Sequence, residues 1–148
     1  MNLTITDTPE YNLREVLSSR LGRFNSERAG PGEWRPIAAV LHDDAGDPVG
    51  GLLGTTSYGW LFVEMLFVPD AMRGRGVGTQ IMRGVEAEAA ARGCRGAWLD
   101  TFEFQARGFY ERLGYSVFAQ LDDYPAGFSR FFMRKSWRPI GSAEGGPE

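Results

Sequence analysis

The order of apolar and polar positions in the middle of the chain predicts a strand followed by a helix. Residues Trp60 to Val68 read WLFVEMLFV and are apolar except at Glu64, which is typical of a strand buried on both faces. Apolar residues then recur at every fourth position, and this spacing predicts an amphipathic helix over Gly76–Arg92. The positions are Val77, Ile81, Val85 and Ala89.

The same reading predicts further elements on both sides of this pair. Helical spacing of leucine and valine follows Asp7 or Thr8, either of which can cap a helix that begins at Pro9. Gly22 to Trp34 is rich in glycine and is expected to be a loop. A second short helix is expected over Phe104–Leu113. Strands are expected over Leu3–Thr6, Pro36–Leu41, Val49–Ser57, Gly96–Asp100, Tyr115–Leu121 and Phe128–Lys135.

This order of elements predicts an α/β fold, with a mixed, mostly antiparallel central sheet of about seven strands flanked by helices. Short turns join the three strands before the central helix, which indicates an antiparallel meander. The strand after that helix is expected to pair in parallel, because a strand–helix–strand crossover returns the chain in the same direction. We expect one domain over residues 1–138 and a flexible C-terminal tail over residues 139–148.

Composition narrows the class of protein. A chain of 148 residues with a net charge of −3 is unlike a nucleic-acid-binding protein, and no apolar run is long enough to span a membrane. The first residues lack the features of a signal peptide, and the single cysteine, Cys94, fits a reducing compartment. No residues show metal-ligand spacing. We therefore expect a cytoplasmic protein with no metal, nucleic-acid or membrane partner.

The turn between the central strand and helix has the features of an anion site. Arg73 to Gly78 reads RGRGVG and opens the predicted helix, whose first N–H groups and positive dipole end favour an anion such as pyrophosphate. No Gly-Lys pair occurs, which excludes a P-loop, and Thr79 stands where a dinucleotide fingerprint needs glycine.

Two motifs resemble those of the GCN5-related N-acetyltransferases. Arg73 to Gly78 matches R-x-x-G-x-G, which resembles the pyrophosphate loop of that family, and residues 106–115 (ARGFYERLGY) resemble its A-x-x-F-Y-x-x-x-G-[FY] segment. The predicted order of elements also resembles the family fold over most of the chain. One departure is Glu103, where many members carry asparagine.

The resemblance implies acetyl-CoA as the acyl donor. It places the backbone at the end of the central strand beside the thioester, and the glycine loop around the pyrophosphate. The cofactor-binding residues implied are Leu66, Phe67, Val68, Arg73, Gly74, Arg75, Gly76, Val77, Gly78 and Thr79.

Two residues are candidates for acid–base chemistry. A lysine-like amine has a pKa of about 10.4, so making it neutral at pH 7 costs about 4.6 kcal/mol and calls for a base. Glu64 is the only charge in the apolar strand, and the resemblance supports it as base, acting directly or through water. Tyr110 matches the family's acid for the leaving thiolate. The structural alternatives are a solvated or arginine-paired Glu64 and a core aromatic at Tyr110.

Aromatic and acidic residues are the candidates for binding the acceptor amine. Trp60, Phe62, Tyr124 and Phe128 are candidate substrate residues, and with Asp122–Asp123 they could form an aromatic, acidic mouth for a cationic amine. The alternative is that the aspartate pair belongs only to a hairpin turn, where aspartate is common. The expected function is transfer of an acetyl group to a primary amine of a small molecule or peptide. A non-catalytic CoA-binding regulatory module is the alternative, and the resemblance allows a homodimer.

Overall fold

The computed structural model of the chain describes residues 1–138. These residues fall into two compact units, residues 1–33 and the chain from Trp34 onward. Among the described residues, none of the helices combines the length and the apolar character that a membrane-spanning segment requires.

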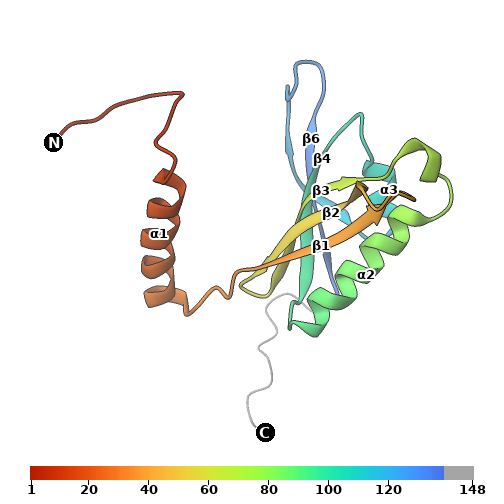
Figure 1. The fold of residues 1–148 in the computed structure, drawn as a ribbon, viewed down its shortest axis with the longest axis horizontal. Coiled ribbons are helices and arrows are strands. Elements are labelled where there is room, and N and C mark those ends of the chain that lie inside the picture. The colour runs from red at the N-terminus through yellow and green to blue at the C-terminus, as the bar shows by residue number, and fades with distance from the viewer. Residues whose placement is uncertain (139–148) are drawn as a thin grey trace, which may run out of the picture. The chain divides into compact units, whose positions relative to one another are not determined.

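Six strands of the described chain form one sheet in the second unit, in the order β1-β2-β3-β4-β6-β5 (Figure 1). Neighbouring strands are antiparallel except for β3 and β4, which are parallel, as the crossover through α2 predicts. The strands are β1 (Arg35–His42), β2 (Pro48–Ser57), β3 (Trp60–Phe67), β4 (Gly96–Phe102), β5 (Ser116–Leu121) and β6 (Arg130–Ser136).

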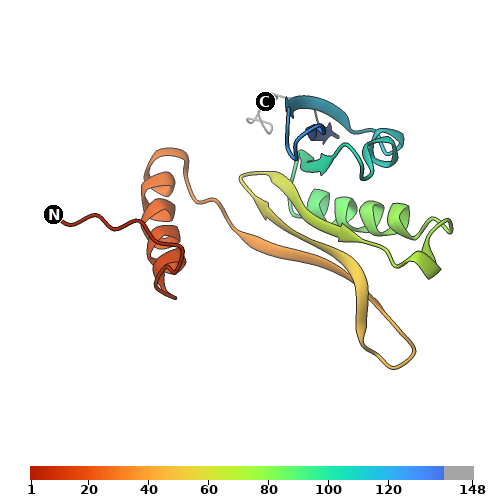
Figure 2. The ribbon, with the colours of Figure 1, turned by 90° about the horizontal axis from the view of Figure 1, so that it is seen from above.

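The helices of this unit are α2 (Val77–Ala91) and α3 (Arg107–Arg112), and a short 3-10 turn, η1 (Asp70–Met72), precedes α2. Helix α2 lies along one face of the sheet and contacts β1 to β4 (Figures 1 and 2). Its apolar stripe is buried on that face, where Met82 and Ala89 have no exposed area. The facing core residues include Leu61, Val63, Leu99 and Met133.

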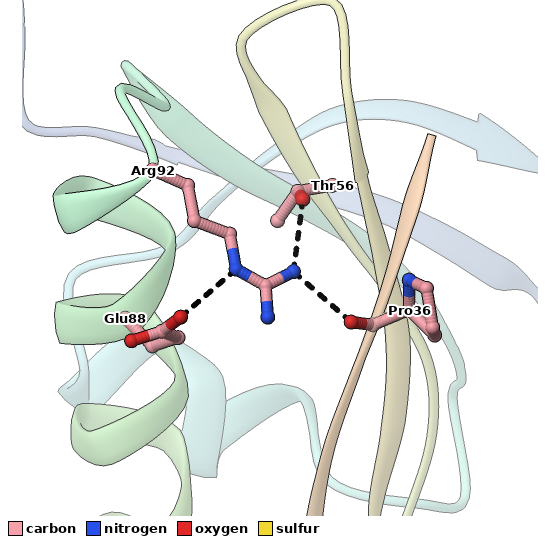
Figure 3. Close-up of polar contacts among 4 residues, drawn as sticks. All are labelled: Pro36, Thr56, Glu88 and Arg92. Carbon is pink, nitrogen blue, oxygen red and sulfur yellow. Dashed lines mark hydrogen bonds and ion pairs between the residues drawn. The ribbon is translucent and has the colours of Figure 1, made fainter. Parts of the chain in front are cut away.

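Arg92, at the C-terminal end of α2, joins the helix to the sheet. Its Nε donates to Glu88 Oε1 at 3.0 Å, and its Nη1 donates to the Pro36 carbonyl at 3.0 Å and to Thr56 Oγ1 at 3.1 Å (Figure 3). One guanidinium therefore ties α2 to β1 and β2, and we call this set of contacts the Arg92 clamp. It fixes the end of α2 that is farther from the glycine loop.

The N-terminal unit contains helix α1 (Leu13–Ala29), which differs from the prediction at both ends. The helix begins at Leu13 and not at Pro9. It continues through Gly22, where a loop is predicted, and ends at Gly30, which has a φ of +78°. One glycine inside a helix costs about 1 kcal/mol, and good helix formers on both sides offset that cost. The strand predicted over Leu3–Thr6 does not form, so the sheet has one strand fewer than predicted.

The second short helix is also shorter than predicted. Phe104 and Gln105 lie in a turn before α3, and the Gln105 side-chain oxygen accepts hydrogen bonds from the Phe102 N–H at 2.9 Å and from Thr101 Oγ1 at 3.2 Å. Both bonds tie the Gln105 side chain to the end of β4, and α3 begins only at Arg107. The predicted tail, residues 139–148, lies outside the described residues.

Candidate active site

A cleft opens where β3 and β4 diverge. The two strands pair only from Trp60 opposite Gly96 to Val63 opposite Leu99, although both continue beyond those positions. The cleft has a volume of about 940 Å³ and is lined by the ends of both strands, the loop before α2, the start of α2, and α3. The carboxyl ends of adjacent parallel strands are the usual place for a ligand in α/β sheets.

Glu64 lies on a β-bulge at the edge of this cleft. On β2, Leu53 and Gly54 are consecutive, but their partners on β3 are Met65 and Val63, so Glu64 is an extra residue without a partner in the register. A bulge bends the strand and redirects a side chain. Glu64 is exposed and lines the cleft, which gives it access to a ligand that an inward-facing strand residue would lack.

The glycine loop forms the other wall of the cleft, and its glycines have different functions. Gly74 and Gly76 have φ values of +73° and +75°, a conformation that residues with a side chain rarely adopt, and space is open beside both. Gly78 has an ordinary φ, but a Cβ there would lie 3.2 Å from the Phe109 ring. The first two glycines shape the loop, and the third lets α2 pack against α3.

The start of α2 suits an anion. The N–H groups of Val77, Gly78 and Thr79 precede the first helical hydrogen bond, which Gln80 N–H donates to the Gly76 carbonyl at 3.0 Å, and these three residues line the cleft. Leu66, Phe67 and Val68 line it from the end of β3. Open space beside a helix start is the arrangement that a diphosphate requires, so these residues fit the predicted cofactor.

The two arginines of the loop are placed differently. Arg73 lines the cleft, but its Nε donates to the Val68 carbonyl at 2.9 Å and its Nη1 pairs with Asp70 Oδ1 at 2.7 Å. Its guanidinium therefore holds the loop to the end of β3. Arg75 is exposed and is not among the residues that line the cleft.

Tyr110, on α3, is a buried side chain that also lines the cleft. Burial, with a smaller contribution from the negative charge of Asp100, raises the pKa of Tyr110 to about 12. Its ring packs edge-on against Phe109 at 5.1 Å and Tyr115 at 5.9 Å between centroids. The phenol is thus fixed in position and keeps its proton at neutral pH.

Sequence reasoning did not single out Asp100 and Arg130, which form an ion pair on neighbouring strands and both line the cleft. Asp100 stands one position beyond the last pair of β3 and β4, at the carboxyl end of a strand predicted to be parallel. Its place at the end of a predicted strand could have identified Asp100 as a site residue. No such indication exists in the sequence for Arg130, because its approach to Asp100 depends on the antiparallel register of β4 and β6.

The predicted acceptor residues do not lie together. Trp60 and Phe62 are not among the cleft-lining residues, and the Phe62 ring stacks on Trp98 at 4.2 Å. Tyr124 and Phe128 belong to the connection between β5 and β6, where their rings contact those of Phe102 and Phe104 respectively, and both of these phenylalanines line the cleft.

Glu103 and the acidic residues of the β5–β6 connection have local structural roles. Asp122 Oδ1 accepts hydrogen bonds from Gln120 Nε2 at 2.7 Å and Ser129 Oγ at 3.2 Å. Asp123 has a φ of +54°, as turn residues do. Glu103, at the departure from the family motif, accepts the Ser129 N–H at 2.8 Å. Asp122 and Asp123 therefore stabilise the turn between β5 and β6.

Cys94 follows the C-terminal end of α2, away from the glycine loop, and is buried. Burial raises the pKa of the Cys94 thiol, against a smaller opposing effect of Arg92, so the nucleophilic thiolate is disfavoured. Among residues 1–138, no group of three or more His, Cys, Asp or Glu side chains is placed to hold a metal ion.

Comparison with known proteins gives relatives over nearly the whole chain. Acetyltransferase Atu2258 of Agrobacterium fabrum is 34% identical over 135 residues, which cover 91% of this chain and 98% of that protein. Blasticidin-S acetyltransferase of Streptomyces morookaense is 39% identical over 107 residues, covering 70% of this chain and 79% of that protein.

A structural match and a family match support the same assignment. A crystal structure of an acetyltransferase from Bacillus cereus superposes with a TM-score of 0.77 at 26% identity, covering 90% of this chain and 97% of that one. The model of the acetyltransferase (GNAT) family matches residues 5–115, which include both sequence motifs up to Tyr115. The chain therefore belongs to the GNAT family of acetyltransferases.

Proposed function

We propose that this protein transfers an acetyl group from acetyl-CoA to a primary amine of a small molecule or peptide, by direct attack of the amine. The observation that carries the proposal is that one cleft is lined by the glycine loop, Glu64 and Tyr110. An anion site, an exposed carboxylate and a protonated phenol are the three groups that this reaction needs.

The glycine loop and the start of α2 would bind the diphosphate of acetyl-CoA through main-chain N–H groups. Arg73 would support them by holding the loop in place, since its guanidinium is engaged with Val68 and Asp70. The end of β3 would bind the extended arm of the cosubstrate, where the strand has left β4 and its residues line the cleft. Bound acetyl-CoA supplies the acetyl group as a thioester.

Glu64 would accept the proton that the amine loses, directly or through water. The bulge supports this role, because it gives a single carboxylate access to the cleft from an otherwise apolar strand. Tyr110 would donate its O–H to the leaving sulfur. A phenol with a pKa of about 12 donates its proton only as negative charge develops on the sulfur, so Tyr110 stays protonated before the reaction.

A small-molecule acceptor is favoured by one relative, which its name describes as acetylating blasticidin S. That relative aligns with 70% of this chain at 39% identity. The same antibiotic is the first acceptor to test, beside aminoglycosides, polyamines, amino acids and peptides.

The test is acetyl-CoA turnover against this panel, repeated with Glu64→Gln and Tyr110→Phe. Each substitution should lower kcat about 100-fold or more while the Kd for CoA, measured by calorimetry, stays within about twofold, because neither side chain is needed for the diphosphate. Matched controls are Glu111→Gln on the outer side of α3 and Tyr58→Phe in the β2–β3 turn, which should retain wild-type kcat. CoA binding without transfer to any amine would favour the regulatory module, and full activity in both variants would refute the assigned roles.

A further inference from the structure

Four aromatic side chains, at the end of β4 and in the β5–β6 connection, contact one another beside the cleft. Phe102 and Phe104 are stacked, with ring centroids 5.1 Å apart and planes 7° from parallel. Phe128 packs edge-on against Phe104 at 5.2 Å, and Tyr124 packs against Phe102 at 5.6 Å. We call these four residues the aromatic shelf.

The shelf is exposed and yet held rigidly. Phe104 is 56% exposed, and Tyr124 and Phe128 are also exposed. The guanidinium of Arg130 lies 4.5 Å from the Phe102 centroid and 5.1 Å from that of Tyr124, and it also pairs with Asp100. The ion pair and the two ring contacts hold Phe102 and Tyr124 in place, and the ring–ring contacts connect Phe104 and Phe128 to them.

The shelf is continuous with the proposed site. Phe102, Phe104 and Arg130 line the same cleft as Glu64 and Tyr110. A fold has no need to expose several large aromatic rings, and an exposed apolar patch beside a cleft is a common sign of ligand binding. The charge of Arg130 is already paired, so the shelf offers flat apolar surface and not a free cation.

We propose that the aromatic shelf binds the planar ring of the acceptor, so that the substrates of this enzyme are amines that carry an aromatic or heteroaromatic ring. This inference rests on the proposed function, because it assigns the acceptor of the same site. Ring stacking favours a planar group over a saturated one of equal size, since aromatic pairs interact beyond the area they bury. The ring lies on Phe104, and the amine reaches past it toward Glu64.

The test compares pairs of primary amines that differ only in the ring, such as benzylamine and cyclohexylmethylamine, with wild type and Phe104→Leu. Wild type should prefer the planar amine by about 2- to 10-fold in kcat/KM expressed per neutral amine, a measure that removes the effect of the lower ammonium pKa of benzylamine. Phe104→Leu keeps an apolar side chain at an exposed position. It should remove the preference by raising KM for the planar amine while kcat changes little. The matched control is Phe118→Leu, an exposed ring of β5 that lies beside Arg134 and does not line the cleft.

Each outcome separates the shelf from the proposed function. Transfer with equal kcat/KM for both amines of a pair, or a preference that Phe104→Leu leaves intact, would overturn the shelf and leave the acetyltransferase function standing. If no amine is acetylated, saturation-transfer NMR in the presence of CoA measures whether benzylamine binds. Binding that Phe104→Leu removes and Phe118→Leu retains would support the shelf although the proposed transfer fails, and absence of binding would overturn it.

Discussion

The residues that set the shape of the glycine loop are Gly74 and Gly76, because their backbones have positive φ and a neighbouring open space. The third glycine of the motif, Gly78, has a packing role against Phe109. From the sequence alone the three glycines were interpreted together, as a way to bring the backbone close to a ligand. The structure separates conformation from packing within one motif.

Gly76→Ala should therefore destabilise the protein by about 1–2 kcal/mol, because alanine in the left-handed region is strained. It should also weaken CoA binding, since relief of the strain would move the first N–H groups of α2. Gly84→Ala is the matched control in the same helix, with ordinary φ and open space, and should stabilise by up to about 1 kcal/mol. Urea unfolding and calorimetry with CoA measure both effects.

An equal response of the two alanine variants would show that the loop does not need a left-handed residue at Gly76.

Single residues were predictable from sequence where their surroundings were local. Glu64 stands out as the only charge in an apolar run, and the structure places it in the cleft. Trp60 and Phe62 lie on the same strand, yet the cleft does not include them, because they stand where β3 is still paired with β4 and the cleft opens only from Val63 onward. Asp100 and Arg130 were missed because their pairing requires the register of two strands far apart in sequence.

At the scale of elements, the Arg92 clamp connects α2 to two strands of the sheet through three hydrogen bonds. The Arg92 side chain is only 14% exposed, and its guanidinium contacts a side chain on α2, a carbonyl on β1 and a hydroxyl on β2. Losing it removes the donor of the buried Thr56 hydroxyl and the packing of a long side chain between α2 and the sheet, which is costlier than losing a surface ion pair.

Arg92→Met should lower the free energy of unfolding by about 2–3 kcal/mol, with an unchanged urea m-value. The affinity for CoA should change little, because α2 has 15 residues and the clamp lies about 22 Å along it from the glycine loop. Arg83→Met, at an exposed position of the same helix, is the control and should change stability by less than about 0.5 kcal/mol. A large loss of CoA affinity in Arg92→Met would mean that the whole helix shifts.

Elements with strong patterns were predicted within a few residues, and those without a buried face were not. The observed ranges of the strands and of α2 lie close to the predicted ones, because the apolar residues of these elements pack into a common core. Helix α1 was misjudged at both ends, and none of its residues is buried, so no apolar pattern marks where it stops. Its end is set locally, by the positive φ of Gly30 followed by Pro31.

At the scale of the whole molecule, the buried tyrosines couple stability to alkaline pH. Burial raises the pKa of Tyr110 to about 12, and burial and Glu86, whose Oε1 accepts the Tyr115 O–H at 3.0 Å, raise the pKa of Tyr115. Between pH 10 and 12 the folded chain keeps protons that the unfolded chain releases, so stability falls as pH rises.

The loss attributable to Tyr110 should approach about 3 kcal/mol across that interval, for a shift of about two pKa units. Urea unfolding between pH 9 and 11 should show stability that is flat at first and then declines, and Tyr110→Phe should decline less steeply. Identical slopes in the two proteins would mean that Tyr110 ionises in the folded protein as it does when unfolded.

The overall topology could be predicted because handedness and connection lengths leave few arrangements for this order of elements. The divergence of β3 and β4 could not be predicted from the residues, since side chains do not show where two strands stop pairing. The sheet with six strands among the described residues, and not about seven, follows from the absence of a strand at the N-terminus.

The bulge in β3 also has a consequence for the rest of that strand. Leu61 and Val63 face the core before it and Leu66 and Val68 after it, so the extra residue shifts the alternation by one position. Losing the codon for Glu64 would restore an unbroken ladder while every core side chain kept its orientation. A descendant of this gene could thus lose the carboxylate proposed as the base and remain a well-folded protein, which is one short route from an enzyme to a binding protein.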